Sequence, residues 1–341
     1  MREPLRQILT RRYGLAAPEI TPIGLGHTNR SFAVAAAGHP DCVLRLGWPG
    51  KPQAQRLREE RLLALLAERA PEIPAPTLVR TLDGHTHAAL DGPEGPQLVH
   101  LFVKLPGEPL YRWRDRCADA HLQAIMAALA QLHRALAGAE QALPCERGDD
   151  LLDALPDRLD AAGAAWARGL PDASPAVLAR LQADGVARFR QRALAILART
   201  PSALGPTIWT HGDFQLENFL FDGDQIVGVV DFDAARRAPR ALDVALALAS
   251  LTREAAREDT FAVDARRWRL GALAYQQAAH PDAPEVEAAL ALDNAGPLLD
   301  LFCLDQALLH LISASGGLWR LEPGIGFLAC YSAVMGRPGQ G

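Results

Sequence analysis

The sequence has no excess of basic residues and no long hydrophobic segment. Its 341 residues carry 35 Lys and Arg against 40 Asp and Glu, a formal net charge of −5, whereas a nucleic-acid-binding surface is normally basic. No stretch reaches the roughly 18 uncharged apolar residues of a membrane span, and the first residues, MREPLRQILTRRYGL, lack the apolar core of a signal peptide. We therefore expect a cytoplasmic protein without a nucleic-acid or membrane partner.

Cysteine is also scarce, and its spacing suggests no pairing. The five cysteines are odd in number and contain no C-x-x-C pair, which argues against a disulfide framework and against a cysteine-based zinc site. Internal repeats and low-complexity tracts are missing as well. A composition of 49% hydrophobic and 22% charged residues instead predicts a globular chain large enough for two lobes.

One segment, WTHGDFQLENFLFDGDQIVGVVDFDAARRAPRALD at residues 209–243, combines residue types that phosphoryl transfer requires. It contains Asp213, then Asn218 five residues later, then Asp231 at the end of an apolar run. A carboxylate can orient an attacking hydroxyl and accept its proton. An amide oxygen and a second carboxylate are hard ligands suited to Mg²⁺. Asp213 is therefore the predicted base, and Asn218 and Asp231 are the predicted metal ligands.

The residues between these ligands predict a β-hairpin. Leu220-Phe221 and the run 226–230 are apolar, and Asp222-Gly223 between them is a turn signal. Such a hairpin would carry Asn218 at one end and Asp231 at the other, and so bring both ligands to one rim. Isolated Asp, Asn and Gly residues are common in ordinary turns, but the combined spacing favours the phosphoryl-transfer interpretation.

This segment resembles the catalytic and metal-binding loops of the aminoglycoside phosphotransferase and choline kinase-like family, whose fold is that of the protein kinases. The kinase patterns H-R-D-x-x-x-x-N and D-F-G correspond here to His211-Gly212-Asp213, Asn218 and Asp231-Phe232-Asp233. The resemblance implies ATP and Mg²⁺ as cofactors. It also implies that His211 and Asp243 support the catalytic loop structurally.

The N-terminal region contains a glycine turn between two predicted strands. Gly24 and Gly26 lack side chains, so the backbone amides of this turn can approach phosphate closely. Taken alone, a G-x-G beside a strand more often marks a simple hairpin. Its position resembles the nucleotide loop of the family, in which an Asn such as Asn29 often follows the glycines, and this likeness favours nucleotide binding.

Kinases place a lysine on the next strand, where it contacts the α- and β-phosphates and pairs with a glutamate of the following helix. In the strand 42–46 of this chain the matching residue is Arg45, and Arg and Lys are not interchangeable. In the predicted helix 53–69, either Glu59 or Glu60 could face Arg45. Glu59 shares a face with Leu63 and Leu66, so Glu59 is the preferred partner.

Further strands are predicted at 73–80, 86–90 and 97–103, the first of them at an edge because of its prolines. By resemblance, the run 98–110 contains the family's hinge, which ends at Leu105-Pro106-Gly107. Main-chain groups near Phe102 and Lys104 would then hydrogen-bond adenine. From about residue 119 onward the apolar spacing is helical.

These elements predict an α+β, two-lobed protein-kinase-like fold. Residues 1–104 would form a nucleotide-binding lobe with a five-stranded antiparallel sheet and a helix. Residues 105–341 would form a mainly helical C-terminal lobe with the catalytic loop, the metal-binding loop and the acceptor site.

The predicted activity is ATP- and Mg²⁺-dependent transfer of the γ-phosphate to a hydroxyl of a small molecule, such as an amino alcohol, an amino sugar or a homoserine-like compound. Acidic residues of the late helices, among them Asp300 and Asp305, could bind an amine, although surface acids are usually only solvated. One alternative is a protein Ser/Thr kinase, which would need a longer segment after Asp231 than the twelve residues to Asp243. Another is a catalytically silent nucleotide-binding protein. In such a protein we would expect Asp213, Asn218 or Asp231 to be replaced, whereas all three are present.

Overall fold

The computed structural model of the chain divides into two compact units. The first comprises residues 1–110, 141–143 and 218–235, and the second comprises residues 111–140, 144–217 and 236–341. The residues that the structure describes are 2–25, 29–48, 53–92, 95–112, 115–139, 142–143, 149–168, 191, 193–196, 198, 204, 206–253, 263–279, 290 and 292–315.

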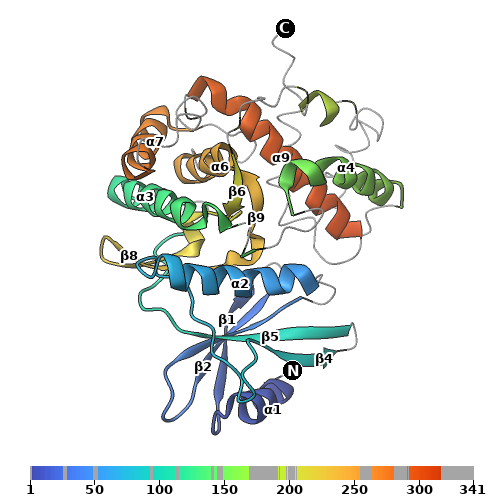
Figure 1. The fold of residues 1–341 in the computed structure, drawn as a ribbon, viewed down its shortest axis with the longest axis vertical. Coiled ribbons are helices and arrows are strands. Elements are labelled where there is room, and N and C mark those ends of the chain that lie inside the picture. The colour runs from blue at the N-terminus through green and yellow to red at the C-terminus, as the bar shows by residue number, and fades with distance from the viewer. Residues whose placement is uncertain are drawn as a thin grey trace. The chain divides into compact units, whose positions relative to one another are not determined.

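The first unit is built on a five-stranded antiparallel sheet with the strand order β1-β2-β3-β5-β4 (Figure 1). The strands are β1 (Glu19–Leu25), β2 (Arg30–Ala35), β3 (Cys42–Leu46), β4 (Ala88–Gly92) and β5 (Gly95–Val103). The predicted five-stranded antiparallel sheet is therefore confirmed.

The alternation of side chains along the strands gives the sheet two different faces. On one face, Leu44 of β3 and Leu101 of β5 are fully buried in a cluster with Leu5 and Leu9 of helix α1 (Arg2–Tyr13). Residues at the intervening positions, such as Arg45 and His100, point to the opposite face, where helix α2 (Gln53–Arg69) supplies their partners (Figure 1). The hydrophobic pattern thus packs the apolar side of α1 against one face of the sheet and leaves polar side chains facing α2.

The predicted edge strand at residues 73–80 is not formed. Only Leu78 makes an isolated bridge, opposite Phe102, although Val79 N–H donates to the Leu101 carbonyl. The segment cannot continue along β5 past Leu78, because β4 pairs with β5 from Val99 onward. The other strands and helix α2 lie where the sequence predicted them.

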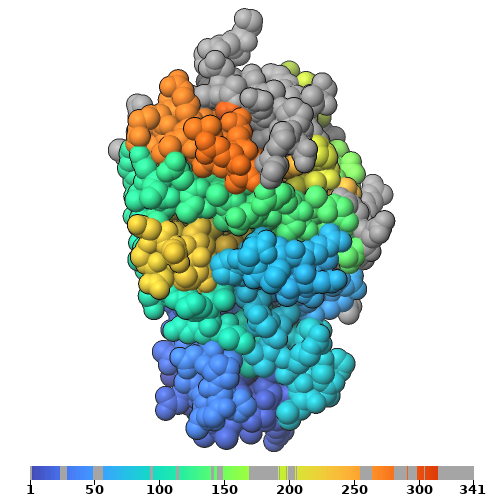
Figure 2. Space-filling view, turned by 60° about the vertical axis from the view of Figure 1, so that its left-hand side comes forward, coloured from blue at the N-terminus to red at the C-terminus, as the bar shows by residue number. Residues whose placement is uncertain are grey.

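A hairpin formed by β7 (Phe219–Asp222) and β8 (Gln225–Val229) also belongs to the first unit. Main-chain bonds join it to earlier residues: Glu108 and Phe221 exchange N–H to carbonyl bonds, and Val229 N–H donates to the Pro74 carbonyl. Arg58 of α2 donates to the Ala235 carbonyl just beyond it, at 2.9 Å. Figure 2 shows the yellow atoms of this segment beside the light-blue atoms of α2.

The second unit is mainly helical, as predicted. Its helices are α3 (Asp119–Leu136), α4 (Leu151–Arg168), α6 (Arg240–Thr252), α7 (Ala265–Ala279) and α9 (Leu292–Ser315). Helix α3 packs on α7, α4 packs on α9, and α6 contacts α3, α7 and α9. Two short strands, β6 (Thr207–Thr210) and β9 (Arg236–Pro239), pair antiparallel. None of the described helices combines the length and the apolar character needed to cross a bilayer.

Candidate active site

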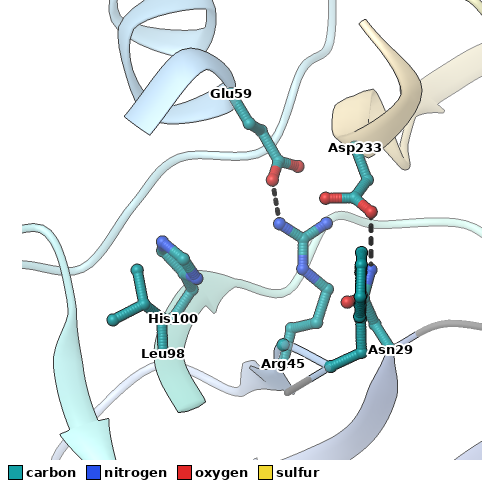
Figure 3. Close-up of a pocket in the computed structure, with 8 residues that line it drawn as sticks. Asn29, Arg45, Glu59, Leu98, His100 and Asp233 are labelled. Carbon is teal, nitrogen blue, oxygen red and sulfur yellow. Dashed lines mark hydrogen bonds and ion pairs between the residues drawn. The ribbon is translucent and has the colours of Figure 1, made fainter. Parts of the chain in front are cut away.

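Arg45 and Glu59 form the centre of the candidate site in the first unit. Arg45 stands on the α2 face of β3, and its guanidinium donates to the Glu59 carboxylate from α2 (Figure 3). The guanidinium also lies over the ring of Phe102, 5.1 Å from its centroid, a distance at which cation–π attraction is effective. Glu59, the glutamate preferred from the helical pattern, is the one that pairs with Arg45.

The charge of Arg45 is stabilised by acidic neighbours. Burial by itself would lower the pKa of Arg45, but the Glu59 carboxylate and, more weakly, Asp231 outweigh it and raise the pKa above its usual value. The Arg45 Nη1 atom lies 3.7 Å from Oδ1 of Asp231. Arg45 is therefore a permanent cation held between a buried carboxylate and the predicted metal ligand.

The β7-β8 hairpin brings Asn218 and Asp231 together, as its sequence predicted. Asn218 directly precedes β7, Asp231 follows β8, and the Val230 N–H donates to the Asn218 carbonyl at 2.9 Å. Asp231 has left-handed backbone angles, φ 65° and ψ 58°, which are uncommon outside glycine and cluster at functional sites. Its side chain is 48% exposed, so the carboxylate is accessible to a ligand.

A small pocket adjoins this group, and it is lined by Asn29, Arg45, Gly47, Trp48, Glu59, Leu98, His100 and Asp233. The buried Asn29 donates from its side-chain amide to Asp233 Oδ2 at 3.1 Å (Figure 3). This bond links the predicted nucleotide loop to the residue two positions after Asp231. Gly24 lies in β1 opposite Ser31, and Gly26 lies outside the described residues.

In the predicted hinge, two main-chain N–H groups are already hydrogen-bonded within the protein and cannot donate to a base. The Val103 N–H donates to the Thr77 carbonyl, and the Lys104 N–H donates to the Asp41 carbonyl. An adenine contact at Lys104 would therefore use its carbonyl. Phe102 contributes its ring beneath Arg45, a contact that the predicted main-chain role did not include.

In the second unit, the loop after β6 presents the predicted base. The Asp213 N–H donates to Nδ1 of the fully buried His211 at 3.3 Å, and the Gln215 side chain donates to Asp213 Oδ2 at 3.0 Å. Gly212 between them has φ +78°, a conformation that favours glycine. The buried imidazole and the glycine thus shape the loop around Asp213, which is itself only partly buried.

Asp243, the second predicted support of this loop, lies buried in the first turn of α6. Its Oδ2 accepts from His133 Nε2 at 3.0 Å, and His133 Nδ1 contacts the Tyr275 hydroxyl at 2.8 Å. These bonds connect α3, α6 and α7. A direct role of Asp243 in bracing the catalytic loop stays a prediction.

Asp305 is neither a solvated surface acid nor a ready amine site. It is fully buried on α9, and its two oxygens accept from Arg158 of α4 and Arg236 of β9. Burial alone would raise the pKa of Asp305, but the two guanidinium groups outweigh it and lower the pKa. Helical periodicity could not reveal this role, because the partners are distant in sequence.

Sequence reasoning also missed the surroundings of Arg45. Trp48 and His100 line the pocket, and Arg58 ties α2 to the end of the hairpin segment. For His100 the sequence did contain a signal, because alternation along the predicted strand places it on the same face as Phe102, two residues later. The structure then sets His100 opposite Arg45 in the β3-β5 register. Glu60, the alternative to Glu59, contacts His87 and His100 instead of Arg45.

Comparisons with known proteins identify the family and the fold of the chain. A model of the phosphotransferase enzyme family matches residues 19–292. Among curated proteins, none matches the chain at a significant level.

Solved structures with a similar fold include three enzymes of low sequence identity. An ethanolamine kinase of Plasmodium vivax has a TM-score of 0.67 at 15% identity, with 96% of this chain and 87% of that chain covered. The macrolide 2′-phosphotransferase MphH of Brachybacterium faecium has a TM-score of 0.61 at 19% identity, covering 99% and 100% of the two chains. The amicoumacin kinase hAmiN, solved in complex with AMP-PNP, Ca²⁺ and Ami, has a TM-score of 0.62 at 13% identity, covering 95% and 92% of the two chains. Because the family model spans most of the sequence and these neighbours share its fold, the chain belongs to the phosphotransferase enzyme family.

Proposed function

We propose that the protein is a small-molecule kinase that uses ATP and Mg²⁺ and transfers the γ-phosphate to a hydroxyl group. The observation that carries the proposal is the group formed by Arg45, Glu59 and Asp231, with Asn218 joined to the same hairpin. Positioning and charge neutralisation are the main requirements of phosphoryl transfer, and this group offers both a fixed cation and oxygen ligands.

The residues present fit a bound Mg²⁺. Asn218 and Asp231 supply amide and carboxylate oxygens, the hard donors that Mg²⁺ prefers, and the Asp231 side chain is half exposed at the end of its strand. Mg²⁺, when bound, neutralises charge on the phosphate oxygens. Arg45, kept charged by Glu59, would bind phosphate oxygens in the place where related kinases use lysine.

Asp213 would orient the acceptor hydroxyl and take its proton. Its carboxylate is held by Gln215, and its backbone is fixed by the contact of its N–H with His211. A fixed, partly exposed carboxylate is what a general base in this position needs, because geometry must hold the proton acceptor within hydrogen-bond reach of the hydroxyl.

For the acceptor we propose a small molecule that carries a hydroxyl and an amine. One solved neighbour is an ethanolamine kinase and another an aminopropanol kinase, and the predicted acceptor classes share that chemistry. A protein acceptor is disfavoured because η3 (Phe232–Ala234), β9 and the start of α6 occupy the twelve residues from Asp231 to Asp243. This leaves no length for an activation segment.

The first test is thermal melting with ATP or GTP, each with and without Mg²⁺, on the wild type and on Asp231→Ala. A ligand that binds the folded state raises the melting temperature. Substitution of a residue that only orients a metal ligand typically lowers metal affinity 10–100-fold. Removal of a ligand itself should therefore weaken Mg-nucleotide binding at least about tenfold. Asp222→Ala, which removes an exposed acid at the far end of the same hairpin, is the matched control. Equal nucleotide affinity in all three proteins would refute the proposed metal site.

The second test separates binding from chemistry. Asp213→Ala should bind Mg-ATP almost as the wild type does, because Asp213 is not a proposed metal ligand. Its turnover with an accepted amino alcohol should fall by about 10²–10⁴-fold, the usual contribution of general base catalysis. Unchanged turnover would remove Asp213 from the mechanism.

A further inference from the structure

A second cluster of ligating side chains lies on the α2 face of the first unit's sheet, apart from the proposed Mg²⁺ ligands. Glu60 of α2, His87 just before β4 and His100 of β5 present one oxygen and two ring nitrogens within 4.8 Å of one another. Glu60 Oε1 lies 2.9 Å from His87 Nδ1 and 2.8 Å from His100 Nε2. Three separate segments of the chain thus bring potential ligating atoms close together.

We propose that Glu60, His87 and His100 form a binding site for a borderline-soft divalent cation, with Zn²⁺ as the best match. Imidazole nitrogen and carboxylate oxygen are common zinc ligands, and a two-His, one-carboxylate set leaves a fourth position for water. Two atoms bound to a tetrahedral zinc ion lie about 3.3 Å apart. The two nitrogen–oxygen separations therefore need to widen by only about half an ångström.

The surroundings of the cluster suit metal binding. The Thr86 hydroxyl donates to the other oxygen of Glu60, so the carboxylate is oriented from outside the ligand set, as outer-shell groups do at metal sites. Metal binding requires an ionised carboxylate and neutral imidazoles, so an ion would take the place of the hydrogen bonds that Glu60 makes with His87 and His100.

The burial of the three residues indicates how an ion would reach the site and what it would do once bound. Glu60 and His100 are buried, whereas the His87 side chain is 29% exposed, so an ion would enter past His87. Once bound, it would tie α2 to β4 and β5 at the residue next to Glu59, the partner of Arg45. His100 also lines the pocket beside Arg45 (Figure 3). The ion would thus fix the helix that holds the Arg45–Glu59 pair.

The test uses the full-length, tag-free protein after treatment with a chelator. Co²⁺, a spectroscopic substitute for Zn²⁺, is titrated while visible absorption is recorded, and Zn²⁺ is then added to displace it. The expected result is a tetrahedral Co²⁺ band that saturates at one equivalent and disappears with Zn²⁺. Zn²⁺ should also raise the melting temperature. No band and no Zn²⁺-dependent shift would mean that the three residues form a hydrogen-bonded cluster only, which overturns the proposal.

Two neighbouring histidines supply a matched pair of variants. His87→Ala removes a ligand at a partly exposed position and should weaken Zn²⁺ binding at least tenfold, whereas His85→Ala removes a 66% exposed histidine two residues away and should not. The band should persist in Asp231→Ala, because that carboxylate belongs to the proposed Mg²⁺ site. Equal binding by the two histidine variants, or loss of the band in Asp231→Ala, would place the ion elsewhere and refute the assignment.

Discussion

Gly107 allows a quantitative prediction, because the structure provides a matched control for it. Gly107 has φ +83° and Gly84 has φ +84°, so an alanine at either position suffers the same left-handed backbone cost of about 1–2 kcal/mol. Their surroundings differ. An added Cβ at Gly107 would lie 2.4 Å from Val227 Cγ2 and 2.7 Å from the Phe221 carbonyl oxygen, whereas at Gly84 it would meet nothing within 4 Å.

The difference between the two variants therefore measures the steric clash alone. Overpacking of this kind costs about 1–3 kcal/mol, so Gly107→Ala should lose about 2–5 kcal/mol of unfolding free energy and Gly84→Ala about 1–2 kcal/mol. With about 2.1 cal/mol/K of unfolding entropy per residue, 1 kcal/mol shifts the melting temperature of this chain by roughly 1.4 °C. The two variants should then melt roughly 1.5–4 °C apart.

Urea unfolding and thermal melting of both variants and the wild type supply the measurement. Gly107→Ala should also weaken Mg-nucleotide binding, because the clash displaces the predicted hinge from Phe221, to which the adjacent Glu108 is hydrogen-bonded. Gly84→Ala should bind nucleotide normally. If the two variants lose the same stability, the close approach of Gly107 to the hairpin is wrong.

Two further substitutions test the buried charges. Arg45→Met should lower the unfolding free energy by about 3–5 kcal/mol, the usual cost of removing one partner of a buried ion pair; the double variant Arg45→Met/Glu59→Met should recover part of it, and a double variant no more stable than Arg45→Met would argue against the pairing. Asp305→Asn should be destabilising at pH 7, because it leaves two arginines facing a neutral group. The pKa of Asp305 is lowered in the folded state, so its stabilising effect is present above the unfolded pKa and is lost as the pH falls through the folded pKa. The variant and wild-type stabilities should therefore converge in acid, and a difference that is constant with pH would contradict the charge argument.

Much of the fold follows from local patterns in the sequence. The ranges Cys42–Leu46, Gln53–Arg69 and Asp119–Leu136 form the strand and helices that their apolar periodicity predicted. The 219–229 hairpin forms because a turn signal separates two apolar strands. The prediction at 73–80 was wrong, since residue composition alone could not show that pairing along β5 is limited to Leu78.

The sequence by itself determined the family and the candidate reaction, because Asp213, Asn218 and Asp231 stand at fixed short spacings that a local loop and hairpin can reproduce. It also placed Glu59 on the correct face of its helix, since the 3.6-residue period defines that face. Only the tertiary structure decided the partners of the buried charges. The partners of Glu60 (two histidines), of Asp305 (two arginines) and of Asn29 (Asp233) lie 27 to 204 residues away along the chain. Burial makes each of these groups require a partner, but which partner it finds depends on how distant elements pack, and periodicity carries no information about that.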